Sequence, residues 1–210
     1  MASEVSICNL ALNHIGAYPI ANLSDASKEA TTCNAIYPFA RDSVLRDHKW
    51  AFATKRLILA LLTDTYSGWD YAYQYPTDCL VAHEIYSEYG DYSGLVYDSE
   101  TDSYVSSGKI EFEICAASSL TSKVILTNKE DAELIYTAKV TDCNMFDGQF
   151  IDALAYRLAT ELAVPIKGNG QMSQAMHQLY QYRLNQAKAI SANECYKKPD
   201  QTNTFVSARG

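Results

Sequence analysis

Residues 24–52 read SDASKEATTCNAIYPFARDSVLRDHKWAF, and this stretch predicts one long helix that ends in a turn toward the core. We expect the helix to begin near Ser24 or Asp25, where a short oxygen-bearing side chain can cap the first free amides. Pro38 predicts a kink near Asn34, because proline lacks an amide hydrogen and crowds the carbonyl four residues earlier. Small or apolar residues recur at alternating steps of four and three residues, which predicts one buried face. They are Ala26, Ala30, Cys33, Tyr37, Ala40 and Val44.

Charged residues of the same helix fall opposite this stripe or beside it. Asp42 precedes Arg46 by four residues, the order that favours an ion pair on a helix surface. Trp50 follows the helix end and can anchor the exit of the chain into the core. We interpret Arg41, Asp42 and Arg46 as an exposed charged face. Contact with a neighbouring subunit and plain solvation are equally compatible with this pattern, and both are favoured over catalysis.

Helical periodicity also occurs at both ends of the chain. The first helix is expected over Ser3–His14, with a buried stripe of Val5, Cys8, Leu12 and Ile15. A third helix is expected over residues 147–163, with Asp147 as its cap and Pro165 as its stop. Its stripe is Phe150, Leu154, Leu158 and Leu162.

A fourth helix is expected over residues 171–194. The residues along its predicted apolar side are Met172, Met176, Leu179, Ala187 and Ile190. The segment 196–210 has no apolar periodicity, so we expect an extended arm that stays outside the core.

Between the helices the sequence changes to short strand-like runs separated by Gly, Asp, Ser and Asn. The runs are 56–62, 71–75, 80–86, 94–97, 109–115, 123–126 and 133–140. The segments GDYSG (90–94) and DSETDS (98–103) are expected at exposed hairpin or loop tips.

The order of these segments predicts an α+β fold. Residues 1–56 and 144–195 would form an antiparallel helical bundle, because paired N- and C-terminal helices can close around one core. Residues 57–143 would form an inserted β-rich region, and residues 196–210 an extended C-terminal arm.

Composition and charge exclude several classes of protein. The net charge of −8 opposes binding to nucleic-acid phosphates, so sequence-reading DNA binding is not expected. The longest apolar run, Leu57–Leu62, is far too short to span a membrane, and the N-terminus does not resemble a secretory signal. The six cysteines form no CxxC pair, and we expect reduced, mostly buried thiols.

Tyrosine is unusually frequent, and nine of the 16 tyrosines lie between Tyr66 and Tyr104. Tyrosine is favoured at wet protein interfaces, but also in half-exposed sheets, and both explanations remain open. We take Tyr89, Tyr92 and Tyr97 as candidates for an interface in the β-rich region.

Catalytic and metal-binding patterns are weak. His83-Glu84 begins an HExx sequence, but position 87 is Ser where a zinc metalloprotease has its second histidine. No phosphate-binding loop or hydrolase elbow occurs, so no cofactor, metal site or catalytic residue is expected. Cys33 with His14 or His48 could form a nucleophile pair, but a buried structural cysteine is favoured.

Four segments together are similar to the head-to-tail adaptor proteins of tailed bacteriophages, a group that includes the tail tubular protein A family. The segments are ICNLALNHIG (7–16), ANLSDASKEATTCNAIYPFARDSVLRDHKWAFATKR (21–56), YAYQYPTDCLVAHEIY (71–86) and FDGQFIDALAYRLATELAVPI (146–166). The similarity is strongest in residues 5–56 and 71–82 and in the two C-terminal helices. Residues 87–125 match only loosely.

This resemblance implies a helical bundle with a β-rich insertion, and a structural role in the virion at the head–tail interface. Twelve copies would form a ring under the portal, extend the DNA channel and dock the tail or nozzle protein. Genomic DNA would pass through the lumen without sequence-specific binding. Before assembly the chain would be in the host cytoplasm. The candidate contacts with the portal or a neighbouring subunit are Arg41, Asp42, Arg46, Lys197, Lys198, Phe205 and Arg209, and Tyr89, Tyr92 and Tyr97 would face the tail.

Two alternatives remain open. The first is a tail-associated peptidoglycan hydrolase, for which Glu84, Glu88 and Asp91 are candidate carboxylates, although solvated loop acids are the favoured interpretation. The second is a host-directed binding module that uses the exposed tyrosines.

Overall fold

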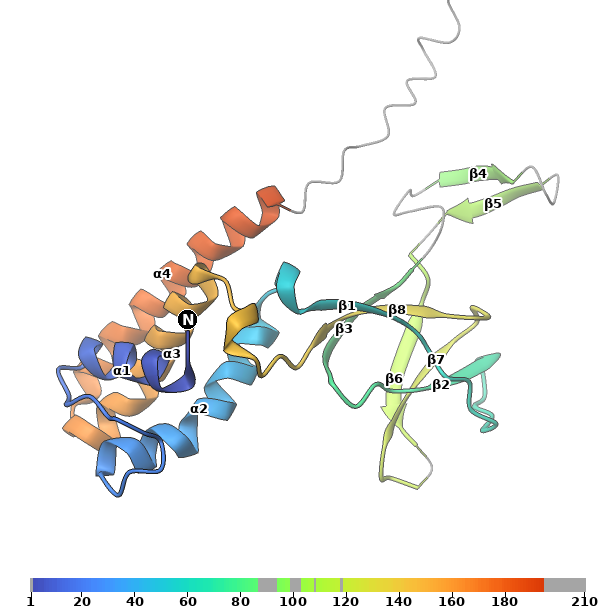
Figure 1. Ribbon diagram of the computed structural model, residues 1–210. Coiled ribbons are helices and arrows are strands. Elements are labelled where there is room, and N and C mark those ends of the chain that lie inside the picture. The colour runs from blue at the N-terminus through green and yellow to red at the C-terminus, as the bar shows by residue number, and fades with distance from the viewer. Residues whose placement is uncertain (1, 87–93, 99–102, 108, 118, 195–210) are drawn as a thin grey trace, which may run out of the picture.

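The computed structural model describes residues 2–86, 94–98, 103–107, 109–117 and 119–194, of which 94–98, 103–107 and 191–194 are described by their backbone alone. Figure 1 shows a helical part and a β part lying side by side. The α+β class is confirmed. The four helices are α1 (Glu4–His14), α2 (Lys28–Asp47), α3 (Gly148–Lys167) and α4 (Gly170–Glu194).

Helix α3 lies at the centre of the helical part and packs against α1, α2 and α4. The predicted stripe of α3 is confirmed, because Phe150, Leu154, Leu158 and Leu162 have no exposed surface. Each such side chain contributes about 1.5–3 kcal/mol on burial. The helical core therefore forms around α3, with residues from both ends of the chain.

The start of α2 differs from the prediction. Ser27, and not Ser24 or Asp25, caps the helix by accepting a hydrogen bond from the Ala30 amide. The Asp25 carboxylate instead accepts hydrogen bonds from the amides of Ala21 and Asn22, at 3.1 and 2.9 Å. Asp25 therefore stabilises a turn that precedes the helix. Ala26, expected in the buried stripe, is exposed, whereas the rest of the stripe is buried as predicted.

The predicted stop at Pro165 is wrong, because α3 continues through Pro165 to Lys167. The proline lies in the last turn, where it removes only one backbone hydrogen bond. Gly168 ends the helix with a left-handed backbone (φ +66°), and its amide bonds back to the carbonyls of Ala163 and Val164.

The buried face of α4 also differs from the prediction. Tyr180, Leu184 and Ala187 are buried, but Leu179 and Ile190 of the predicted stripe are 40% and 44% exposed. The predicted set combined residues from two different faces of the helix. Helix α4 consequently has one apolar face against α3 and a second apolar face in solvent.

The β part contains three antiparallel groups of strands. The first sheet has the order β1 (Thr54–Ile58), β8 (Glu133–Ala138), β3 (Cys79–Ile85). The second has the order β2 (Tyr71–Gln74), β7 (Lys123–Thr127), β6 (Phe112–Ala116). Strands β4 (Gly94–Asp98) and β5 (Ser103–Ser107) form an antiparallel pair, and residues 99–102 of the predicted DSETDS tip lie outside the described residues. Strand β5 was not predicted.

Single bridges join the two larger sheets. Leu61, which follows β1, pairs with Tyr73 of β2, and Ile85 of β3 pairs with Ile110, which precedes β6, so the two sheets are joined at two places. Residues such as Leu59, Ile125 and Leu134 form a buried cluster in this β part, separate from the helical core. The 3₁₀ helices η1 (Ala51–Ala53) and η2 (Cys143–Met145) lie where the chain leaves and re-enters the helical part.

Among the described residues, no helix has both the length and the hydropathy needed to cross a membrane.

Candidate protein interaction site

The charged residues of α2 lie at the seam between the helical and β parts. The Arg41 guanidinium donates two hydrogen bonds to one Asp42 oxygen, at 2.9 and 2.7 Å, and Arg41 is only 4% exposed. The other Asp42 oxygen lies 3.1 Å from Nζ of Lys139, which follows β8. Asp42 therefore neutralises a buried cation and also contacts the β part.

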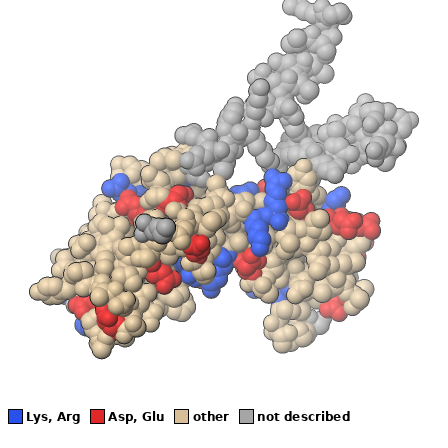
Figure 2. All heavy atoms as spheres, viewed as in Figure 1, with Lys and Arg blue, Asp and Glu red and all other residues tan. Residues whose placement is uncertain are grey.

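A side chain in the last turn of α2 and another just after the helix reach strand β3. Arg46 donates a 2.9 Å hydrogen bond to the Leu80 carbonyl, and Lys49 lies 3.1 Å from Glu84. These contacts replace the predicted Asp42–Arg46 ion pair. Figure 2 shows acidic and basic side chains beside one another in the middle of the visible face, with wide uncharged areas around them.

The prediction of an exposed charged face is thus wrong for Arg41, which is buried. Arg46 is exposed, but its head group is engaged by β3. The geometry indicates that this cluster holds the two parts of one chain together. A contact of these residues with a portal or a neighbouring subunit stays a prediction.

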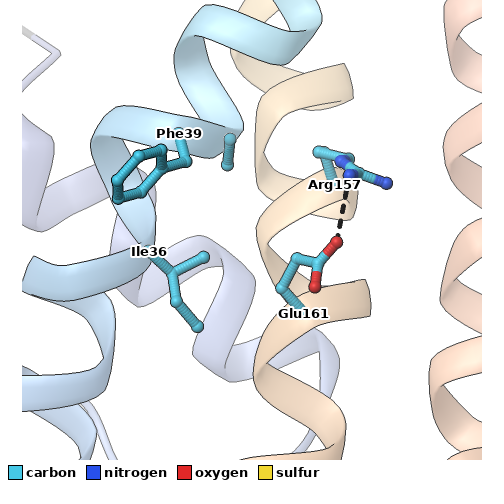
Figure 3. Close-up of a pocket in the computed structure, with 5 residues that line it drawn as sticks. Ile36, Phe39, Arg157 and Glu161 are labelled. Carbon is cyan, nitrogen blue, oxygen red and sulfur yellow. Dashed lines mark ion pairs between the residues drawn. The ribbon is translucent and has the colours of Figure 1, made fainter.

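An open groove lies elsewhere on the helical part, between α2 and α3. It has a volume of about 270 Å³ and is lined by Ile36, Phe39, Ala40, Arg157 and Glu161. In Figure 3 Ile36 and Phe39 of α2 lie across from an ion pair on α3, in which Arg157 and Glu161 are 3.0 Å apart, and the Phe39 ring is turned away from that pair. The groove therefore has one apolar wall and one polar wall.

Phe39 is the most unusual residue of this groove, because its ring is 78% exposed. Val164, one turn beyond Glu161 on α3, is 53% exposed. Exposed aromatic and aliphatic side chains beside a groove are typical of protein contact sites. Sequence reasoning missed Phe39, although a large aromatic residue next to the buried stripe of an amphipathic helix is the signal that marks it.

The β part has its own exposed apolar residues. On and after β1, Leu57, Ile58 and Leu61 are 41%, 68% and 62% exposed. The tyrosines are divided, since Tyr73 and Tyr136 are buried and Tyr86 lies at the surface under the Arg56 guanidinium. Part of the tyrosine enrichment is therefore core packing.

Several predicted contacts cannot be placed. Tyr97 lies in β4, but its side chain is outside the described set. Tyr89 and Tyr92 lie outside the described residues, as do the four arm candidates Lys197, Lys198, Phe205 and Arg209.

The candidate hydrolase carboxylates do not form a described site. Glu84 is paired with Lys49, and Glu88 and Asp91 lie outside the described residues. Nε2 of His83 forms a 2.7 Å hydrogen bond with the Thr137 hydroxyl. Within the described part of the chain, no group of three or more His, Cys, Asp or Glu side chains could hold a metal ion.

Two histidines are packed into the helical part. His14 stacks on Tyr156 with ring centroids 4.2 Å apart, and His48 packs edge-on against Trp50. Burial lowers the pKa of both imidazoles below the ordinary 6.5. Cys33 is buried in the same core, and the structure does not pair it with either histidine through a hydrogen bond. These contacts are those of core residues.

Comparison with known proteins gives no further assignment. No protein-family model matches the chain, and no curated protein matches it.

Proposed function

We propose that this protein is a structural head-to-tail adaptor of a tailed-phage virion. In this proposal its copies form a ring under the portal, which extends the DNA channel and docks the tail or nozzle protein. The proposal starts from the sequence resemblance, which is strongest in residues 5–56 and 71–82 and in the two C-terminal helices. These segments contain α1–α4, β2 and the start of β3.

The structural observation that carries the proposal is the exposed Phe39 at the groove between α2 and α3. Burial of the exposed Phe39 and Val164 side chains against a neighbouring protein would remove apolar surface from water, which would favour assembly. Exposed apolar residues on β1 give the β part a second surface for a different neighbour, such as a tail protein.

Net charge supports the same role. A chain with a charge of −8 repels DNA phosphates, so a channel built from it would let DNA slide. The ring of twelve, the portal partner and the virion location come from the resemblance.

The test is co-sedimentation of the full chain with its cognate portal ring over a range of salt concentrations. The proposal predicts stoichiometric co-sedimentation with the portal. Failure to associate at every salt concentration would overturn it. A zymogram on peptidoglycan tests the hydrolase alternative. The adaptor proposal predicts no cleared band, whereas a peptidoglycan hydrolase would produce one.

A further inference from the structure

Basic side chains gather around the turn that connects β2 with β3, on the side of the β part that faces the helices (Figure 1). Nζ of Lys55 lies 2.9 Å from the Asp78 carboxylate, and the Lys139 amide donates a 2.7 Å hydrogen bond to the Asp78 carbonyl. Arg46 donates to the Leu80 carbonyl at 2.9 Å. Cationic residues from β1, from α2 and from the segment after β8 therefore meet at one short turn.

A further cation comes from the first residue of β7. Nζ of Lys123 lies 5.3 Å from the centre of the Tyr75 ring, a distance that allows a cation–π contact. Burial raises the pKa of the Cys79 thiol, whereas Lys123 and Arg46 both act in the opposite direction, so both cations lie near that side chain. The positive charges thus belong to one surface, which we call the β2–β3 basic patch and which consists of Arg46, Lys55, Lys123 and Lys139.

Two carboxylates touch the patch, and they do not neutralise it. Asp42 is shared between Lys139 and the buried Arg41. Together with Asp78 it opposes the patch and Arg41, five cationic side chains in all, which leaves a local charge of +3 in a chain whose net charge is −8. Within the described part of the chain, Lys123 takes part in no ion pair.

The patch is open to solvent. The side chains of Lys55 and Lys139 are 53% and 45% exposed, and Arg46 and Lys123 are exposed as well. An ammonium group has three donors and a guanidinium has five, so the contacts within the chain leave several donors unused. The patch is therefore able to bind further carboxylates or phosphates.

Charge favours an acidic protein segment over DNA as the partner. Surface charges are screened beyond about 8 Å at physiological ionic strength, so a short acidic segment on the patch interacts mainly with the local positive charge. Duplex DNA is stiff, carries one negative charge per about 1.7 Å of its axis, and extends beyond the patch. The rest of the chain holds an excess of carboxylates, which repels the phosphates.

We propose that the β2–β3 basic patch is a docking surface for an acidic, Asp- or Glu-rich segment of a partner protein. The carboxylates of that segment pair with the lysines of the patch and with the unused donors of Arg46. The inference goes beyond the proposed function and depends neither on ring formation nor on portal binding.

The experiment is fluorescence anisotropy of a labelled oligoglutamate peptide, titrated with the full chain at low and at high salt. We expect binding that weakens as the salt concentration rises. Lys123→Glu should lower the affinity by about fivefold or more, because it removes one attraction and adds a repulsion. Lys123→Arg keeps the charge and should bind like wild type.

Lys129→Glu is the matched control. Lys129 lies just beyond the other end of β7, is exposed, and forms no ion pair with any described residue. The variant has the same change in net charge as Lys123→Glu, but the change lies away from the patch, so the affinity should stay within about twofold of wild type. Circular dichroism and thermal denaturation establish that each variant is folded.

Four results would overturn the inference. The first is the absence of salt-dependent binding to oligoglutamate, and the second is an equal loss of affinity in Lys123→Glu and Lys129→Glu. The third is tighter binding of a labelled DNA duplex than of oligoglutamate, which would assign the patch to nucleic acid. The fourth is salt-dependent self-association of the chain that Lys123→Glu abolishes, which would assign the patch to a second copy.

The inference and the proposed function can fail separately. If oligoglutamate does not bind but the chain still co-sediments with the portal, only the docking surface is wrong. If oligoglutamate binds as expected but portal co-sedimentation fails, only the proposed function is wrong.

Discussion

Arg41 places a positive charge inside the helical part, and Asp42 is the side chain that compensates it. Removing one partner of a buried ion pair leaves an isolated charge, which is costly because water cannot reach it. The same carboxylate contacts Lys139, so its loss also weakens the seam between the two parts of the chain.

We predict that Asp42→Ala lowers the free energy of unfolding by about 3 kcal/mol, the low end for a broken buried pair. Asp152→Ala is the matched control, because it breaks a pair with Arg183 whose side chains are 41% and 34% exposed. The control should cost at most about 1 kcal/mol. Urea denaturation measures both, and equal losses would contradict the account of Arg41.

His14 and His48 make stability depend on pH. For His14, burial lowers the pKa, Asp152 acts in the opposite direction, and Arg183 lowers the pKa further. His14 therefore binds more protons in the unfolded chain than in the folded chain as the pH falls from 6.5 toward the lowered pKa. Stability is full above that pH and falls as the pH drops toward the lowered pKa.

The corresponding variant is His14→Phe, which keeps a ring against Tyr156 but cannot titrate. We expect thermal denaturation of this variant to show a smaller loss of stability than wild type when the pH is lowered through 6.5. His48→Phe should reduce the loss further, because the His48 pKa is lowered mainly by burial as well. Identical pH profiles for wild type and both variants would contradict the assignment.

The backbone conformation of a glycine determines where helix α3 ends. Gly168 has φ +66°, a region that strains a side chain, whereas Gly170 begins α4 without such a constraint. A Cβ atom added at either glycine would meet no heavy atom within 4 Å, so space alone would permit alanine at both.

We predict that Gly168→Ala destabilises the protein by about 1 kcal/mol, because alanine must adopt a left-handed backbone. Gly170→Ala should be neutral or slightly stabilising, since alanine favours a helix. Thermal denaturation compares the two variants. Equal melting temperatures would show that Gly168 does not determine the end of α3.

At the level of elements, periodicity was sufficient where one face was strongly apolar. The stripe of α3 was predictable for this reason. The anchor at Trp50, whose indole donates to the Val44 carbonyl at 2.9 Å, was predictable from its position just after the helix end. The start of α2 was not predictable from the sequence, because Ser24, Asp25 and Ser27 are all favourable N-cap residues. Ser27 is the cap in the structure, where the Asp25 carboxylate is instead used by the amides of the preceding loop.

The candidate site was less predictable than the fold. The charged residues in and just after α2 were recognised in the sequence. Their contacts within the chain were not predictable, because the partners Leu80, Glu84 and Lys139 are distant in sequence. Likewise, the two apolar faces of α4 could not be separated before α3 was known to cover only one of them.

At the scale of the whole molecule, the C-terminal segment is predicted to make the portal contact. All the buried residues of the described part of the chain lie before residue 191, so we expect deletion of residues 197–210 to leave the melting temperature unchanged. We expect portal co-sedimentation to be lost. Normal portal binding by the truncated chain would remove the arm from the proposal.

The most direct test of the central claim is negative-stain electron microscopy of the full chain mixed with its cognate portal ring, compared with the chain alone. The account predicts a collar bound to one face of the portal, with matching rotational symmetry and an open central channel. Portal rings that remain bare at every salt concentration would contradict it.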